Sequence, residues 1–258
     1  MTSYRWNTSA AAEAFDAGAP AIHPFYAVVQ DEILALLAVD GHEPACVVDL
    51  GGGSGRLLER VLERFPKSQV VLVDQSAAFL AIAERKLARF GDRVTLVEHR
   101  LQDDWPAALA QPPDALVSMS AIHHLEPAEK KALYKRCYDA LAADGLLANG
   151  DEFRPESDSE YLAMLKSWSE QKDVETAAGW IPASFRPIFD AWHDRNITHF
   201  GEPKHSGDDC NETAAAQERY LRAAGFRNVH VAWAKELWGV LIGRRSLAAD
   251  PTRQAAPG

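Results

Sequence analysis

Residues 45–55 read Ala-Cys-Val-Val-Asp-Leu-Gly-Gly-Gly-Ser-Gly, a short β-branched run followed by four glycines within five positions. The run from 45 to 50 predicts a buried strand. Glycines let the backbone turn sharply and approach a ligand closely. Residues 54–65 then have the apolar spacing of an amphipathic helix, for which Ser54 is the expected N-terminal cap. A strand, a glycine loop and a helix N-terminus in this order are typical of the nucleotide crevice of an α/β sheet.

The alternation of strands and helices continues along the chain. The predicted strands are 69–73, 93–98, 114–118, 146–150, 228–234 and 237–243, and the predicted helices are 77–90, 127–142 and 212–224. Strands that alternate with helices at this spacing form a parallel sheet covered on both faces. The predicted fold is therefore α/β: a doubly wound, mostly parallel, seven-stranded sheet with a C-terminal antiparallel hairpin and a helical insertion after the fifth strand.

The pattern also divides the chain into segments. We expect an N-terminal helical segment at 1–44, a Rossmann-like domain made of 45–151 and 212–245, a helical insertion at 154–211 and a disordered tail at 246–258. Within the first segment, 25–39 is predicted to be helical and 1–24 irregular, because Gly18, Pro20 and Pro24 interrupt it. Within the insertion, helices are predicted near 158–170 and 183–195.

Composition excludes several classes of protein. The chain has 258 residues, of which 47% are apolar and 25% charged, as in an ordinary globular protein. Its formal net charge of −10 repels phosphate backbones, so a nucleic-acid partner is not expected. No apolar run reaches the roughly 20 residues of a membrane helix, and the first residues lack a signal-peptide core, so no membrane partner is expected either.

Cysteine usage indicates the compartment. Cys46, Cys137 and Cys210 are far apart and odd in number, which argues against a disulfide framework and fits a reducing environment. We therefore expect a soluble, cytoplasmic protein, whose oligomeric state the sequence leaves open.

The spacing of the glycines narrows the class of ligand. Gly51, Gly53 and Gly55 form the pattern GxGxG, whereas dinucleotide sites have GxGxxG, and Arg56 occupies the position of the last glycine. The Gly-Lys-Ser/Thr of a Walker loop is absent as well. Asp74 ends the second predicted strand about 20 residues beyond the loop, the usual offset for a carboxylate that accepts from ribose hydroxyls.

An acidic residue before GxGxG resembles motif I of the class I, Rossmann-like S-adenosylmethionine-dependent methyltransferases. The resemblance covers about 45–151 and 212–243 and implies S-adenosylmethionine as the cofactor. It implies that the glycine loop passes under the methionine part of the cofactor, that Asp49 holds the amino end and that a turn near Asp103, or Asp104 one residue on, borders the adenine. The residues assigned to the cofactor in this way are Asp49, Gly51, Gly52, Gly53, Gly55, Asp74, Gln75, Gln102, Asp103 and Ser118.

The segment from Ser118 to Leu125, Ser-Met-Ser-Ala-Ile-His-His-Leu, is similar to the fourth-strand segment of many small-molecule methyltransferases. A hydroxyl or ammonium acceptor must lose a proton, often to a histidine or a carboxylate. His123, His124 and Glu152 are therefore the candidate catalytic residues, all at the C-terminal edge of the sheet, although the histidine pair also suits a purely structural role in the loop. The Asn/Asp-Pro-Pro-aromatic motif of enzymes that methylate base amino groups is absent, and so is the Pro-Cys of cytosine-C5 enzymes. The implied activity is methyl transfer to a small-molecule O or N acceptor.

The insertion is rich in large aromatic side chains, which can bury an apolar acceptor and exclude water. The candidate substrate-binding residues are Trp6, Tyr26, Trp168, Trp192 and His193. Tryptophans in such a segment also serve packing alone. The spacing from His193 to His199 to His205 matches no tight ligand motif, so no metal site is expected.

Two other functions stay open at this point. One is an NAD(P)-dependent oxidoreductase on a similar sheet, which the glycine spacing disfavours. The other is a non-catalytic S-adenosylmethionine-binding subunit that regulates a partner, because no single residue here is an unmistakable catalyst.

Overall fold

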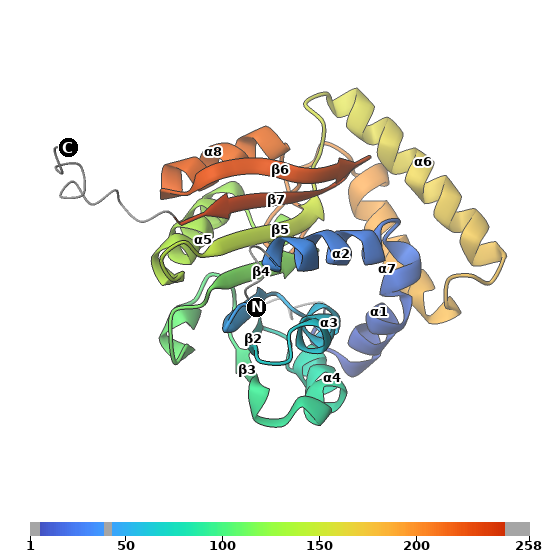
Figure 1. Cartoon of the computed structure of the whole chain (residues 1–258). Coiled ribbons are helices and arrows are strands. Elements are labelled where there is room, and N and C mark those ends of the chain that lie inside the picture. The colour runs from blue at the N-terminus through green and yellow to red at the C-terminus, as the bar shows by residue number, and fades with distance from the viewer. Residues whose placement is uncertain (1–5, 39–42, 246–258) are drawn as a thin grey trace, which may run out of the picture.

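A seven-stranded sheet forms the centre of the molecule in the computed structural model, which describes residues 6–38 and 43–245 (Figure 1). The strands are β1 Cys46–Leu50, β2 Gln69–Asp74, β3 Val94–Glu98, β4 Ala115–Met119, β5 Leu146–Glu152, β6 Arg227–Lys235 and β7 Trp238–Arg244. Their order is β3-β2-β1-β4-β5-β7-β6, and all neighbours are parallel except β7, which is antiparallel to both β5 and β6. The predicted sheet and its C-terminal hairpin are confirmed.

Helices cover the sheet on both faces. On one face α2 (Tyr26–Leu37), α3 (Arg56–Arg64) and α4 (Ala77–Leu87) bury their apolar side chains in one core cluster; on the other, α5 (Pro127–Ala140) and α8 (Ala214–Ala224) pack into a second. Strands β1, β4, β5 and β7 are buried along most of their length, as expected for strands with two covered faces, whereas the edge strands β3 and β6 are partly exposed. Short 3₁₀ segments at Ala88–Arg93, Trp105–Ala108 and Ile122–His124 complete the turns.

The N-terminal segment differs from the prediction. Residues predicted to be irregular form helix α1, Ser9–Ile22, capped by the hydroxyl of Thr8, which accepts from the Ala11 N–H. Pro20 lies within this helix and cannot donate to the carbonyl of Asp16, four residues earlier. That carbonyl accepts instead from an Arg56 guanidinium nitrogen at 2.6 Å. The proline is tolerated because α3 supplies the hydrogen bond that the helix loses.

The predicted N-cap of helix α3 is also wrong. Helix α3 begins at Arg56, and its N-cap is Gly55, which has a left-handed backbone with φ of +78°. The Ser54 hydroxyl donates instead to the Asp16 carboxylate, which also pairs with Arg56 and Lys86. Asp16 therefore ties α1 to the glycine loop, to α3 and to α4.

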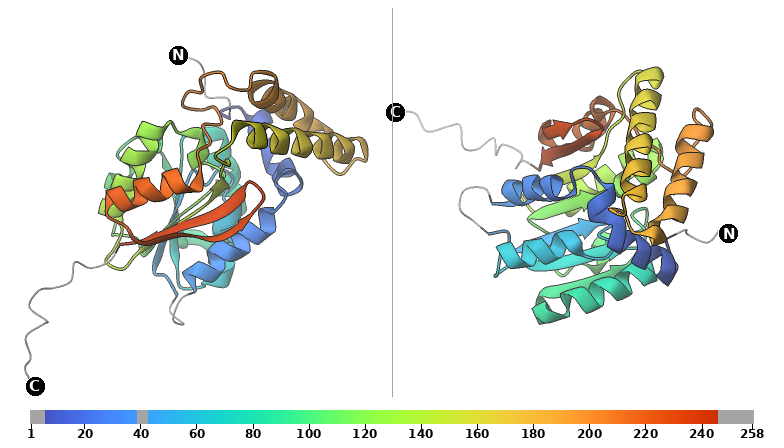
Figure 2. Two further views of the ribbon diagram at one scale, coloured as in Figure 1. Left: turned by 90° about the horizontal axis from the view of Figure 1, so that it is seen from above. Right: turned by 90° about the vertical axis from the view of Figure 1, so that its right-hand side faces the viewer.

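Helices α6 (Asp158–Ala177) and α7 (Arg186–His193) occupy the segment after β5, with a 3₁₀ turn at Ala183–Phe185 and a π-helical turn at Asp194–Thr198. Helix α6 is longer than predicted, and α7 is shorter. Figures 1 and 2 show α7 beside α1 and α6 beside α7, at the end of the sheet toward which β5 and β6 point. Ile22, Ile181, Phe185 and Phe189 form a separate apolar cluster that joins α1 to this pair.

The predicted tail, 246–258, lies outside the described residues. In the ranges that the structure describes, no helix is both long enough and apolar enough to cross a membrane.

Candidate active site

A cavity lies at the edge of the sheet where strands β1 to β5 end, beneath α1, α6 and α7. Measured out to open solvent, its empty volume is about 1750 Å³. Residues from the turn after each of the five parallel strands line it, including Gly51, Asp74, Gln102, His123 and Glu152. This is the edge at which ligands bind in open α/β sheets.

The glycine loop approaches its neighbours too closely for any side chain. A Cβ added at Gly51 would lie 2.5 Å from the Cβ of Ala121, and Gly51 also has a left-handed φ of +72°. A Cβ at Gly52 would lie 2.7 Å from a carboxylate oxygen of Asp49. The backbone at these positions is therefore exposed to the cavity, and glycine is required there.

Two buried carboxylates flank the loop. Asp49 is 1% exposed and Asp74 is 7% exposed. Burial raises the pKa of Asp49 to about 8, and the nearby Asp74 raises it further. Burial also raises the pKa of Asp74 to about 6, although its oxygens accept from the N–H groups of Gly53 at 2.9 Å and Ser76 at 2.8 Å. Oδ1 of Asp49 has no hydrogen-bond partner among the described residues. Such a pair favours a ligand that brings positive charge and donors.

Most residues assigned to the cofactor line this cavity: Asp49, Gly51, Gly52, Gly53, Asp74, Gln75 and Gln102. Three do not. Gly55 is the cap of α3, and Ser118 is fully buried and donates to the Leu50 carbonyl at 2.8 Å. Asp103 turns back to accept from the Arg100 N–H at 3.2 Å. These three residues shape the turns that carry the others.

A histidine–aspartate pair stands at the polar end of the cavity. Nδ1 of His123 lies 2.6 Å from Oδ1 of Asp151, and the His123 backbone N–H donates to the other carboxylate oxygen at 2.9 Å. Burial alone would raise the pKa of Asp151, but His123 lowers it below its ordinary value, so the carboxylate is ionised and can only accept. The Nδ1 of His123 is therefore the donor, and in the neutral ring Nε2 carries the lone pair. Burial would lower the pKa of His123, but Asp151, Asp209 and Glu152 together raise it.

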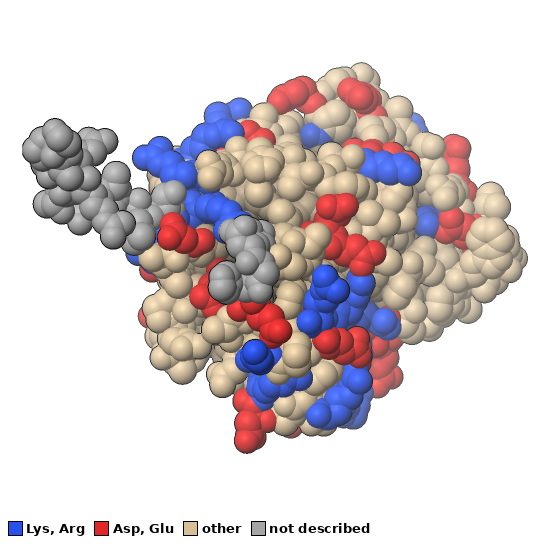
Figure 3. Space-filling view, viewed as in Figure 1, with Lys and Arg blue, Asp and Glu red and all other residues tan. Residues whose placement is uncertain are grey.

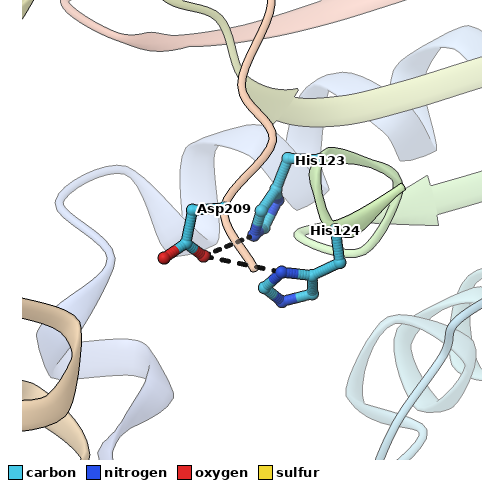
Figure 4. Close-up of side chains that lie close together, drawn as sticks. All are labelled: His123, His124 and Asp209. Atoms are coloured by element: carbon cyan, nitrogen blue, oxygen red, sulfur yellow. Dashed lines mark ion pairs between the residues drawn. The ribbon is translucent and has the colours of Figure 1, made fainter. Parts of the chain in front are cut away.

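Two further groups lie beside this pair (Figure 4). Oδ1 of Asp209 is 3.6 Å from Nε2 of His123 and 3.5 Å from Nδ1 of His124, and the two imidazole rings are 4.0 Å apart. His123, His124 and Asp209 form the group of potential metal ligands found among the described residues. His193, His199 and His205 are not part of it. The prediction of no metal site was based on the spacing of His193, His199 and His205, whereas the structure brings His123, His124 and Asp209 together.

Glu152 forms a second polar group at the end of β5. Its Oε1 accepts from the Tyr161 hydroxyl at 2.9 Å and from the Asn211 amide at 2.8 Å. Burial raises the pKa of Glu152 to about 7, and Asp209 adds to the effect. Glu152 lines the cavity as His123 and His124 do, so all three candidate catalytic residues meet there.

The remaining wall of the cavity is apolar. Trp168 of α6 packs against Trp192 of α7 with ring centroids 4.4 Å apart, and Trp6, before α1, and Tyr26, the first residue of α2, also line the cavity. All four predicted substrate-binding aromatics line the cavity, whereas His193 does not. Residues that the sequence analysis missed also line it: Phe15, Ile22, His23, Phe185, Ile188, Phe189, Arg195 and Asp209.

These omissions have several causes. Phe15 and Ile22 belong to α1, which was predicted to be irregular, so their helical spacing was not considered. Asp151 directly precedes Glu152 in β5. Two adjacent acidic residues at the end of a strand are the pattern that could have identified Asp151. Asp209 reaches the site from a loop, and no local pattern indicates its place.

Comparison with known proteins indicates the class of protein. Residues 48–147 match the family model of a methyltransferase domain. The chain is 32% identical over 164 residues to a malonyl-[acyl-carrier protein] O-methyltransferase of Geobacter sulfurreducens, covering 60% of this chain and 58% of that protein. It is 42% identical over 85 residues to a ribosomal RNA small subunit methyltransferase H of a Nocardioides species, covering 33% of this chain and 26% of that protein. The chain thus spans less than two thirds of these curated relatives.

Solved structures share the fold. Human N-acetylserotonin methyltransferase, in complex with S-adenosylmethionine, superposes with a TM-score of 0.61 at 14% identity, covering 94% of this chain and 58% of that one. Fold and cavity define a doubly wound nucleotide-binding domain with a loop of the GxGxG type. Residues 48–147 are a class I, Rossmann-like methyltransferase domain of the S-adenosylmethionine-dependent type.

Proposed function

We propose that the protein transfers a methyl group from S-adenosylmethionine to an oxygen or nitrogen atom of a small molecule. The observation that carries the proposal is one cavity lined at one end by the glycine loop with Asp49 and Asp74, and at the other by His123 and Glu152. Holding two reactants in line can contribute several kcal/mol to lowering a barrier. A single cavity that spans both groups of residues suits this task.

The residues at the loop fit the cofactor. The Asp74 carboxylate has about four lone-pair sites and accepts from the backbone N–H groups of Gly53, Ser76 and Gln75, so it retains acceptor capacity for a ribose hydroxyl. Oδ1 of Asp49, buried and without a hydrogen-bond partner among residues 6–38 and 43–245, is suited to an ammonium donor. The cofactor supplies an activated methyl group when bound, so the chain must orient the acceptor and accept its proton.

His123 is the residue we assign to the proton. Asp151 holds its ring through Nδ1, which leaves the Nε2 lone pair toward the cavity. Glu152, with its raised pKa, is the second group that can exchange a proton there. Positioned proton transfer of this kind contributes about 10²–10⁴-fold to a rate.

The acceptor is proposed to be a small molecule and not a nucleic acid. The cavity is walled by Trp168, Trp192 and Phe189 from the segment after β5, which suits a compact apolar ligand. On the face shown in Figure 3, positive and negative side chains are interspersed, without the broad basic surface that a phosphate backbone requires. We also propose a cytoplasmic location, because the free thiols of Cys46, Cys137 and Cys210 suit a reducing compartment.

Isothermal titration tests the class of cofactor. We expect micromolar-scale binding of S-adenosylmethionine and S-adenosylhomocysteine, and much weaker binding of NAD. Tight NAD binding without heat from either adenosyl ligand would favour the oxidoreductase. Cofactor binding without turnover of labelled methyl, across a panel of phenols, amines and carboxylic acids, would favour the regulatory subunit.

Cofactor affinity is expected to rise with pH. The pKa values of about 6 for Asp74 and about 8 for Asp49 mean that the free protein holds these carboxyls partly protonated, whereas a cationic ligand favours their ionised forms. The raised pKa values also mean that each carboxyl stabilises the free protein less as the pH rises from the ordinary aspartate value of 3.8 to the value in the folded protein. The melting temperature of the free protein should therefore fall from about pH 4 to about pH 8, with only Asp49 contributing above about pH 6, while the shift caused by S-adenosylhomocysteine grows. Asp49→Asn should flatten the upper part of the curve of melting temperature against pH. If the shift caused by S-adenosylhomocysteine is independent of pH in both proteins, Asp49 and Asp74 are not the groups that bind the ligand.

The aromatic wall is expected to act on the acceptor alone. Trp192→Ala removes the partner of Trp168 and opens the cavity, so the KM for the acceptor should rise about tenfold or more while cofactor affinity stays unchanged. His193→Ala, one residue away but outside the lining, is the matched control and should leave both constants unchanged. Steady-state kinetics and cofactor titration on folded protein check this. If Trp192→Ala only lowers the melting temperature and keeps a normal KM, the tryptophan serves packing.

A further inference from the structure

His123, His124 and Asp209 meet from two parts of the chain. The histidines occupy the 3₁₀ turn after β4, and Asp209 lies in the segment between α7 and α8. The distances of 3.6 Å and 3.5 Å from Oδ1 of Asp209 to the imidazole nitrogens are too long for good hydrogen bonds. They are close to the spacing of neighbouring ligand atoms around a tetrahedral zinc ion, roughly 3.3–3.4 Å for metal–ligand bonds of about 2.0–2.1 Å. One ligand atom from each of the three residues lies within 4.8 Å of the others.

Neighbouring groups orient two of the three side chains. Metal-binding histidines usually donate their second ring N–H to a carboxylate or a carbonyl, which fixes the ring and raises its basicity. His123 has this arrangement, because its Nδ1 donates to Asp151 and its Nε2 faces Asp209. The Asn196 amide donates to Oδ2 of Asp209 and leaves Oδ1 toward the histidines.

His124 requires one adjustment. Its Nδ1 lies 3.0 Å from the Asp208 carbonyl, and this contact must be released for Nδ1 to bind a metal ion. The ring itself already stands next to His123 and Asp209.

The local charge favours a dication. The carboxylates of Asp151 and Asp209 lie 2.6 Å and 3.6 Å from the two ring nitrogens of His123. Arg195 opposes this charge, with its guanidinium 3.8 Å from Oδ2 of Asp209, whereas the histidine nitrogens lie nearest Oδ1. Two imidazoles and one carboxylate are a donor set that suits zinc and other late first-row dications.

We propose that His123, His124 and Asp209 bind a transition-metal dication of the zinc type, with its remaining coordination position open to the cavity. A site with three protein ligands and one open position is the arrangement found where a metal ion meets exchangeable ligands. The ion would use the Nε2 lone pair of His123, which is the same lone pair that we assign to the acceptor proton. This consequence rests on the proposed function: zinc and the acceptor proton compete for one atom, so zinc inhibits methyl transfer.

Zinc binding is measured first, without donor or acceptor. Protein treated with EDTA and then freed of it is titrated with Zn²⁺ against a chromogenic chelator. We expect one tight site per chain. Loss of a single outer partner of a metal site typically costs about 10–100-fold in affinity, so loss of a ligand in His124→Ala or Asp209→Asn should cost more than about 100-fold. His205→Ala, whose side chain is 78% exposed and stands outside the cluster, is the matched control and should bind zinc as the unaltered chain does.

Several outcomes decide the proposal. Absence of tight zinc binding by the unaltered chain, or equal binding by His124→Ala and Asp209→Asn, overturns it. If either variant fails to fold by circular dichroism, a zinc-edge anomalous difference map of the unaltered chain replaces it: a peak between the three side chains supports the site, and a peak elsewhere overturns it. Zinc bound at the site without loss of methyl transfer supports the metal site and contradicts the role of His123 in the proposed function, so the two failures are distinguishable.

Discussion

Replacing His123 with alanine is expected to lower the rate of methyl transfer at saturating substrates by about 10²–10⁴-fold, the usual contribution of a positioned proton acceptor. The variant loses the Nε2 lone pair, but it keeps the glycine loop, Asp49 and Asp74. Affinity for S-adenosylmethionine should therefore stay within about twofold, because the interaction removed acts on the acceptor. Transfer of labelled methyl under EDTA-treated conditions measures the rate, and isothermal titration measures the affinity.

Two further variants complete this experiment, one as a control and one to test the carboxylate that orients His123. His230→Ala removes an exposed histidine of β6 far from the cavity and should behave as the unaltered chain does. Asp151→Asn keeps the size of the group that orients the His123 ring but removes its charge, so we expect a smaller loss of rate with the same cofactor affinity. A His123→Ala variant with normal turnover would leave Glu152 as the candidate for the acceptor proton.

Replacing Asp74 with asparagine is expected to weaken binding of S-adenosylmethionine by about one to two decades. The loss of a charged hydrogen-bond partner costs roughly 1.5–3 kcal/mol, which corresponds to that range of affinity. Asparagine keeps the size of the side chain at the end of β2, but its amide nitrogen cannot accept from Gly53, Ser76 or a ribose hydroxyl. Titration with S-adenosylmethionine and with S-adenosylhomocysteine should show the same loss.

Glu98→Gln provides the matched control for charge. Glu98 pairs with Asp74 in the register of β3 and β2, but it is exposed and lies outside the cavity. Glu98→Gln should keep normal cofactor affinity. That result would show that the loss in Asp74→Asn comes from the position of the carboxylate and not from the change in net charge. Unchanged affinity in Asp74→Asn, with a normal melting curve, would remove Asp74 from the cofactor site.

The sheet was predictable because its signals are local. The valine-rich runs before Gly51 and Asp74 mark strands by composition, and the order of the turns that follow the strands places these turns on one edge. The glycine loop was predictable for a similar reason, since the close approach of Gly51 to Ala121 needs glycine at that position.

The predictions that failed concern residues whose structure depends on contacts distant in sequence. Pro20 was taken to interrupt the chain, but the hydrogen bond that permits a helix there comes from Arg56, on another element. Asp209 joins the histidines across more than eighty residues of sequence, and its place follows from how α6 and α7 fold back over the sheet. Side-chain periodicity carries no information about either contact.

The linkage through Asp16 has a consequence for how a bound nucleoside would exchange with solvent. Burial would raise the pKa of Asp16, but Lys86, Ser54 and Arg56 lower it, so the carboxylate stays charged and keeps all its partners over the ordinary pH range. Because α1 supplies Phe15 and Ile22 to the cavity wall, detaching α1 opens the wall and releases the neighbour of the glycine loop in one event. The Asp16 carboxylate therefore couples the position of a wall helix to the glycine loop, together with the apolar contacts of Ile22 with Phe185 and Phe189.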